Sequence, residues 1–183
     1  MESLKKMTKI IQCSLDMLAT ALTMEEKGKA FYEEAKNSCQ DPQCREIFSS
    51  LIEDEIMHTR RIEEIHDTLI AEKCWTRDWK SIKKSSTDLG AFFRGLAAKE
   101  RKKIKAETSD LEAIDIGLNL ESASIKFYQD HRAKSTDPSE ISFLDQMILE
   151  EKEHWKALKD TRYYLTDPEG WFIEKERAGL DGE

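Results

Sequence analysis

The sequence contains an internal repeat with a period of 96 residues, and this repeat restricts the possible folds more than any other feature. The segment from Met17 to His66 aligns without a gap on the segment from Ala113 to Arg162. The paired positions are Glu25 with Glu121, Phe31-Tyr32 with Phe127-Tyr128, Asp41-Pro42 with Asp137-Pro138, Glu55 with Glu151 and His58 with His154. Two equivalent structural units are therefore expected.

Composition is consistent with one helical domain over residues 1–183. The 183 residues, 39% of them apolar and 36% charged, are enough for a sizeable core, and seven Gly and three Pro leave room for long helices. The net charge of -8 argues against nucleic-acid and anionic-membrane partners. No apolar run of about 18 residues and no signal peptide is present, so we expect a cytoplasmic protein that does not contact a membrane.

The four cysteines are scattered, without a Cys-x-x-Cys pair. This spacing disfavours a structural zinc site or a rubredoxin-type iron site. Cys39 and Cys44 flank a predicted turn and are near enough in sequence to meet. In a cytosolic protein, however, we expect all four, Cys13, Cys39, Cys44 and Cys74, to be reduced thiols.

Apolar periodicity and helix-capping signals predict two helical hairpins. The first helix is expected to end near Ser38 and the second to run from Asp41-Pro42 to about Ala71, because Asp caps free amides and Pro fits the first helical position. Ser109 with Glu112 is a capping-box signature for the start of the third helix. Asp137-Pro138 predicts the start of the fourth.

Residues 72–108 form a connector between the hairpins that is too long for a tight turn. We expect it to cross over along the bundle and to include a short helix from about Asp88 to Lys105. The basic run from Lys99 to Lys105 is interpreted as a solvated helix face, with docking of an acidic redox partner as the alternative. The tail, residues 167–183, carries Trp171 and Phe172 and is expected to pack over the end of the bundle or to contact another subunit.

The spacing of the acidic residues and histidines predicts that they converge. Glu25 lies fifteen residues before the centre of the first turn and Glu55 fifteen residues after it, so both stand roughly 22 Å from the turn. The same arithmetic places Glu121 and Glu151 level with each other. His58 and His154 follow their glutamates by three residues, on the same helix faces.

These positions fall on apolar stripes, where an unpaired carboxylate is costly. Four glutamates would balance two divalent cations, and two neutral imidazoles would complete the ligand sets. Oxygen and imidazole ligands suit iron or manganese, and zinc or cobalt is possible. A third Glu-x-x-His, formed by Glu63 and His66, has no repeated partner and is interpreted as a surface or supporting feature; His131 is also expected to be exposed.

The pattern Glu-(x5)-Phe-Tyr, followed about thirty residues later by Glu-x-x-His, resembles the rubrerythrin branch of the ferritin-like superfamily. The segment Asp167-Pro-Glu-Gly-Trp-Phe resembles the tail of rubrerythrin-related proteins. The resemblance implies an all-α, ferritin-like four-helix bundle that assembles into a homodimer or a larger homo-oligomer. It also implies two iron ions per chain, with manganese or zinc possible, and the ligands Glu25, Glu55, His58, Glu121, Glu151 and His154.

Two departures from the family pattern affect the expected chemistry. The chain lacks the rubredoxin domain with its two Cys-x-x-Cys pairs, so electrons would come from a separate donor protein such as rubredoxin. Ser124 stands where rubrerythrins have a further Glu linked to peroxide reduction, which argues against peroxidase activity. Tyr32 and Tyr128 match tyrosines that hydrogen-bond ligand carboxylates, although both could instead be core aromatics.

These observations favour a di-iron oxidoreductase that reduces peroxide or dioxygen in oxidative-stress defence. One alternative is a ferroxidase, iron buffer or iron-storage protein with the same site. A second alternative is a ferritin-like scaffold without catalytic activity.

Overall fold

The computed structural model describes residues 2–82 and 108–180, and the secondary structure in these two ranges is entirely helical. The elements are α1 (Glu2–Ser38), α2 (Pro42–Glu72), a 3-10 helix η1 (Asp78–Ser81), α4 (Thr108–Arg132), α5 (Pro138–Thr166) and α6 (Pro168–Leu180). The predicted all-α fold is confirmed. The predicted short helix from Asp88 to Lys105 and the basic run lie outside the described residues.

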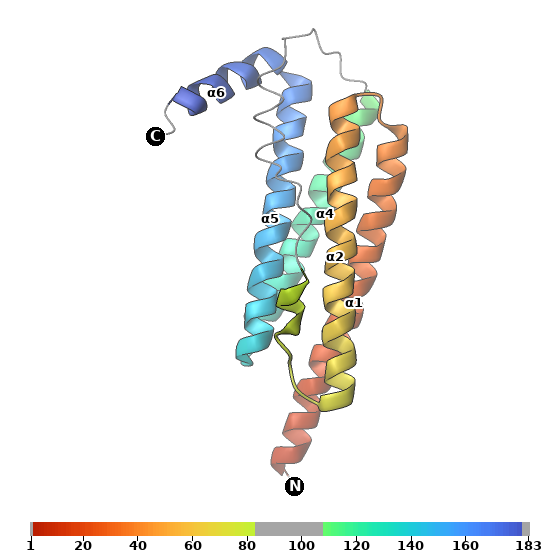
Figure 1. Ribbon diagram of the computed structural model, residues 1–183, viewed down its shortest axis with the longest axis vertical. Coiled ribbons are helices and arrows are strands. Elements are labelled where there is room, and N and C mark those ends of the chain that lie inside the picture. The colour runs from red at the N-terminus through yellow and green to blue at the C-terminus, as the bar shows by residue number, and fades with distance from the viewer. Residues whose placement is uncertain (1, 83–107, 181–183) are drawn as a thin grey trace.

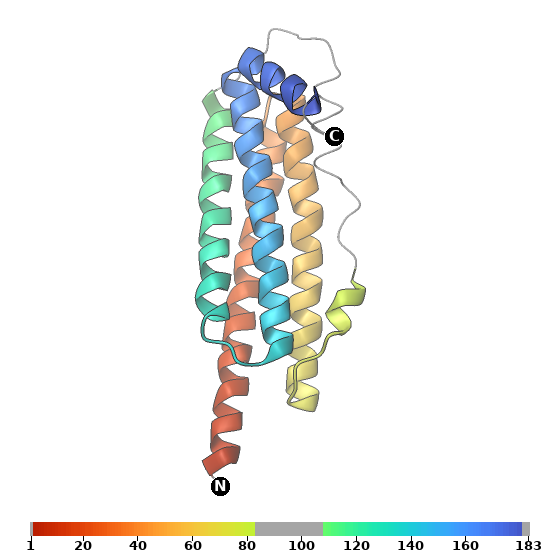
Figure 2. The same cartoon turned by 90° about the vertical axis from the view of Figure 1, so that its left-hand side faces the viewer.

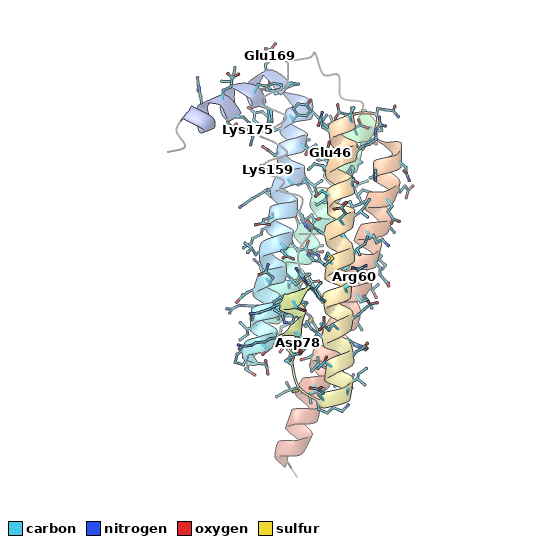
Figure 3. The ribbon with its side chains drawn as sticks, in the orientation of Figure 1. Glu46, Arg60, Asp78, Lys159, Glu169 and Lys175 are labelled. Carbon is cyan, nitrogen blue, oxygen red and sulfur yellow. A yellow bond between two sulfur atoms is a disulfide. The ribbon has the colours of Figure 1, made fainter. Side chains whose placement is uncertain are left out.

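The four long helices form two antiparallel hairpins, α1 with α2 and α4 with α5 (Figure 1). The hairpins meet through α1 against α4 and α2 against α5. Their turns lie at opposite ends of the bundle, as both ribbon views show (Figure 2). The end of α2 is consequently a bundle length away from the start of α4, as the predicted crossover requires. Charged residues such as Glu46 and Arg60 lie on the exposed outside (Figure 3).

Both predicted Asp-Pro helix starts are present. The Asp41 carboxylate accepts hydrogen bonds from the amides of Gln43 (2.8 Å) and Cys44 (3.1 Å), and Asp137 does the same for the second hairpin. The predicted cap at Ser109 is wrong. Because α4 already includes Thr108, the Ser109 side chain lies within the first helical turn and does not occupy the capping position.

The first turn contains a disulfide between Cys39 and Cys44, which corrects the expectation that these thiols are reduced. The short turn brings their Cα atoms to 6.2 Å, within the range that a disulfide spans. Both residues are buried in the core cluster that includes Trp171 of α6. Cys13 and Cys74 are free and exposed.

The second turn has a hydrogen bond at the equivalent place. Ser135 and Glu140 are the repeat counterparts of Cys39 and Cys44, and the Ser135 hydroxyl donates to the Glu140 carboxylate at 2.6 Å. Ser14 of α1 donates to the other oxygen of Glu140 at 3.0 Å. Each hairpin turn is thus closed by an internal contact, a disulfide in the first turn and a hydrogen bond in the second. At the second turn, Glu140 also joins α5 to α1 of the opposite hairpin.

At the opposite end of the bundle, Asp110 of α4 binds the backbone of the first turn. Its buried carboxylate accepts the amides of Gln40 (3.0 Å) and Asp41 (2.9 Å). We expect Asp110→Ala to lower the free energy of unfolding by about 1–3 kcal/mol, because two amides lose a charged acceptor. Urea unfolding of the metal-free protein measures this change. Asp67→Ala, at a highly exposed carboxylate, is the control and should leave the midpoint unchanged.

The C-terminal segment packs on the bundle end, as the sequence predicted for Trp171 and Phe172. Both side chains are buried, at 0% and 3% exposure, and they contact Tyr164 of α5. This segment is the helix α6, which lies across the end of the bundle near the first turn (Figure 2). None of the described helices has a stretch long and apolar enough to cross a membrane.

Candidate metal centre

The six side chains selected from the repeat lie together near the middle of the bundle. Helix α2 has 31 residues and α5 has 29, and Glu55 and Glu151 lie close to the two midpoints. The layers of acidic residues from the two hairpins therefore coincide even though their turns are at opposite ends. The exposed fractions are at most 4% for Glu25, Glu55, His58, Glu121, Glu151 and His154.

Each histidine turns its Nδ1 atom toward the carboxylates. His58 Nδ1 lies 2.9 Å from Glu25 Oε2 and 3.3 Å from Glu151 Oε1. His154 Nδ1 lies 3.3 Å from Glu151 Oε2 and 3.7 Å from Glu121 Oε1. The two imidazole rings stack with their centroids 5.5 Å apart. Nδ1 is therefore the nitrogen of each ring that faces the space between the carboxylates.

The donor atoms form two overlapping groups suited to two cations. One group contains Glu25, His58 and Glu151, and the other contains Glu55, Glu121, Glu151 and His154. Glu151 belongs to both groups, as a bridging carboxylate would. Its Oε1 atom and the Nδ1 atom of His154 are buried without a hydrogen-bond partner among the described residues. Such orphaned donor atoms, in a set of four carboxylates and two imidazoles, fit a pair of divalent metal ions.

In the metal-free protein, protons compensate the buried charge. Burial and the charge of Glu151 raise the pKa of Glu121 to about 8. Burial and Glu25 hold the pKa of Glu55 well above its usual value. Burial lowers the pKa of His58, but the carboxylates of Glu151 and Glu25 outweigh burial and raise it well above 6.5. The site therefore attracts either protons or metal cations.

Two tyrosines connect the carboxylates across the hairpins. Tyr32 of α1 donates a hydrogen bond to Glu121 of α4, and Tyr128 of α4 donates one to Glu25 of α1. Burial, and then the nearby carboxylates, raise the pKa of both hydroxyls well above 10. The tyrosines remain neutral donors that fix one oxygen of each carboxylate, the role that the family resemblance suggested.

Sequence reasoning missed two buried carboxylates, Asp54 and Glu150, which we call the outer carboxylates. Glu150 lies 2.9 Å from Nε2 of His58, and Asp54 lies 3.2 Å from Nε2 of His154. Each therefore contacts the histidine of the opposite hairpin on the side away from the cluster. A carboxylate in this place fixes the imidazole tautomer and leaves Nδ1 available for a metal. The repeat pairs Asp54 with Glu150, and each of them directly precedes the glutamate of a Glu-x-x-His motif. This repeated acidic position was the sequence signal that could have identified the outer carboxylates.

The other two histidines lie apart from the cluster. His66 is half-buried, with Nδ1 3.6 Å from the exposed carboxylate of Asp67, as its surface interpretation predicted. His131 is half-buried and not exposed, because its ring packs on Phe127 at 4.6 Å. Neither belongs to the groups that could hold a metal ion in the described part of the chain.

A cavity of about 170 Å³ reaches the cluster between α1 and α4. Gly28 and Ser124, which are repeat counterparts, both line it. A Cβ atom at Gly28 would stand 3.7 Å from the Glu55 carboxyl carbon, so this small residue leaves space beside that carboxylate. The cavity is large enough for a molecule of a few atoms next to Glu25, Glu55 and Glu121.

A bundle of two helical hairpins with carboxylates and imidazoles buried at its centre defines a ferritin-like protein with a candidate dinuclear metal site. A family model described as Rubrerythrin matches residues 16–161. The chain belongs to the rubrerythrin family. Comparisons with curated proteins and with solved structures found no significant match.

Proposed function

We propose that the protein is a di-iron oxidoreductase that reduces peroxide or dioxygen with electrons from a separate donor protein such as rubredoxin. The observation that carries this proposal is the buried cluster in which two Nδ1 atoms and four carboxylates face one another. Glu25, His58 and Glu151 would hold one iron, and the other would be held by Glu55, Glu121, Glu151 and His154. Iron bound there would supply one electron from each ion.

The protein's own residues prepare the site for this chemistry. Glu150 and Asp54 orient the two imidazoles, and the hydroxyls of Tyr32 and Tyr128 hold the carboxylates of Glu121 and Glu25. These contacts fix the donors before a metal arrives, which lowers the cost of assembling the site. The nearly complete burial of the cluster excludes bulk water, and the cavity beside Gly28 and Ser124 would admit a small oxidant.

The reaction with peroxide needs two electrons and two protons and yields two water molecules. Iron held at the cluster would supply the two electrons, and the two protons would come from solvent through the cavity lined by Gly28 and Ser124. The donor protein would then restore the ferrous state.

The test uses full-length protein loaded anaerobically with Fe(II). Rapid mixing with a limiting amount of hydrogen peroxide should oxidise two ferrous ions per peroxide, followed at the near-ultraviolet absorption of ferric carboxylate sites. A reductant should then regenerate the ferrous protein for repeated cycles. Oxidation by dioxygen in air, measured in parallel, identifies the preferred oxidant. A loaded site that peroxide and dioxygen both fail to oxidise would overturn the proposal.

A ferroxidase or iron-buffering role is the second candidate, and Ser124 favours it. Ser124 lines the cavity at the place of the further Glu that the resemblance links to peroxide reduction. In this case ferric iron should leave the site after one oxidation, and added Fe(II) should replace it without any reductant. Gel filtration with iron analysis after a single oxidation separates the two roles.

A further inference from the structure

The two halves of the candidate metal centre differ outside the ligand set. The outer carboxylates Asp54 and Glu150 are repeat counterparts, and each contacts the Nε2 atom of one histidine. An outer carboxylate acts on the metal through the imidazole. When the carboxylate accepts a hydrogen bond from Nε2–H, Nδ1 becomes a stronger electron-pair donor to a metal. A difference between the surroundings of these two carboxylates would therefore change the metal affinities of the two positions.

Glu150 is neutralised by a buried cation. Arg61 Nη1 donates to Glu150 Oε2 at 2.6 Å, and Gln146 Nε2 donates to Glu150 Oε1 at 2.7 Å. Arg61 is 4% exposed, and its Nη2 atom also donates to the carbonyl of Ile82 at 3.1 Å. Arginine keeps its charge at all ordinary pH values. His58 therefore shares its outer carboxylate with a permanent positive charge.

Asp54 has no equivalent support. The repeat counterparts of Arg61 and Gln146 are Ala157 and Ser50, which cannot supply a cation. Within residues 2–82 and 108–180, Asp54 Oδ1 is buried without a hydrogen-bond partner, and so is the Ser50 hydroxyl. All of the hydrogen bonding that this carboxylate offers in the described structure is directed at His154. The contact of Asp54 with Nε2 of His154, at 3.2 Å, is longer than the 2.9 Å contact of Glu150 with His58, so the advantage of Asp54 lies in charge and not in proximity. Arg61 offsets the charge of Glu150, and no counterpart offsets that of Asp54 in the described structure.

We propose that Arg61 makes the two metal positions unequal, so that a divalent cation fills the His154 position first and the His58 position second. The positive charge of Arg61 repels a cation bound at His58, and its hydrogen bond withdraws electron density from Glu150. The donor groups differ in the same direction, because the group that contains His154 has three carboxylates and the group that contains His58 has two. This inference rests on the proposed function, since it requires that both positions bind metal.

Calorimetric titration of the metal-free protein with Co(II) tests the order of filling. We expect two steps whose dissociation constants differ by about tenfold or more, which is the effect of a changed outer partner on metal affinity. The visible absorption of Co(II) follows both steps independently of any catalytic activity. His154→Ala should remove the tighter step and His58→Ala the weaker one.

Two isosteric variants should act in opposite directions. Asp54→Asn removes the charge behind His154 and should bring the two dissociation constants together. Glu150→Gln leaves Arg61 uncompensated behind His58 and should separate them further. Arg61→Met should also bring the two dissociation constants together. If loss of the guanidinium prevents folding, Asp54→Asn still tests the inference. Circular dichroism verifies that each variant is folded.

The outcomes distinguish this inference from the proposed function. Two equal binding steps in the unaltered protein, or variants that shift both steps equally, would overturn the inference and leave a dinuclear site intact. Absence of Co(II) and Fe(II) uptake would overturn the proposed function and the inference together. Unequal steps with the predicted opposite shifts would establish Arg61 as the residue that positions charge at one half of the site.

Discussion

Glu151→Gln should abolish the binding of both metal ions. Glu151 places one oxygen 3.3 Å from Nδ1 of His58 and the other 3.3 Å from Nδ1 of His154, so both donor groups depend on it. A neutral amide keeps the size of the side chain and removes the bridging charge. The loss of affinity should exceed the roughly 10- to 100-fold cost of losing an outer partner. Iron per chain, measured by elemental analysis after anaerobic loading, should fall from about two to near zero.

The chain contains a matched control for this experiment. Glu63→Gln alters the third Glu-x-x-His in the same way, but Glu63 is exposed and His66 contacts Asp67. This variant should retain the full metal content. Circular dichroism verifies that both variants remain helical. If Glu151→Gln kept both ions with unchanged affinity, the arrangement of ligands proposed above would be wrong.

The hairpins were predictable because the sequence marks their ends with strong local signals. Asp41-Pro42 and Asp137-Pro138 each place a capping carboxylate before a residue that can only begin a helix. The start of α4 was less well marked, since Ser109 with Glu112 imitates a capping box inside a helix that begins at Thr108. Capping signals of this kind specify a helix more reliably than its first residue.

The ligand layer was predictable from helix geometry. Fifteen residues separate each acidic position from its turn, and helices of 31 and 29 residues place that distance at the middle of the bundle. Antiparallel hairpins therefore bring both layers together. The outer carboxylates were missed because their contacts join α2 to α5, and spacing within one helix carries no information about the helix that packs against it.

The first-turn disulfide shows a further limit of sequence reasoning. Cys39 and Cys44 were assigned as reduced from the expected compartment, whereas their pairing depends on local geometry at a short turn. Their burial depends on Trp171 and Phe172, which lie more than a hundred residues away in the sequence and cover the turn from α6. Composition provides no means of identifying such a contact.

The stability of the metal-free protein should fall as the pH rises from about 5 to 8. The pKa of Glu121 is raised to about 8, so between 4.5 and 8 the folded state binds more protons than the unfolded state. For each proton that the folded state binds in excess, the free energy of unfolding falls by roughly 1.4 kcal/mol for every unit by which the pH rises. Glu55, His58 and His154, whose pKa values are also raised, change stability in the same direction. Thermal unfolding monitored by circular dichroism across this range measures the trend.

Below this range the sign reverses. The hydrogen bond from His58, its charge and that of Arg61 outweigh burial and lower the pKa of Glu150 to about 2, and His58 also holds the pKa of Glu151 well below 4.5. The stability that these two carboxylates contribute is present above pH 4.5 and is lost as the pH falls toward 2. The metal-free protein should therefore be most stable in mildly acid solution.

Metal should invert the upper part of this profile. Ions bound at the cluster replace the protons, so their stabilising effect grows as the pH rises and proton competition weakens. The difference in Tm between the loaded and metal-free protein should increase from pH 5 to pH 8. Glu121→Gln is the control, because removal of this one ionisation should make the metal-free profile less steep. A metal-free Tm that rises over the same range would mean that the folded protein does not take up protons at this cluster.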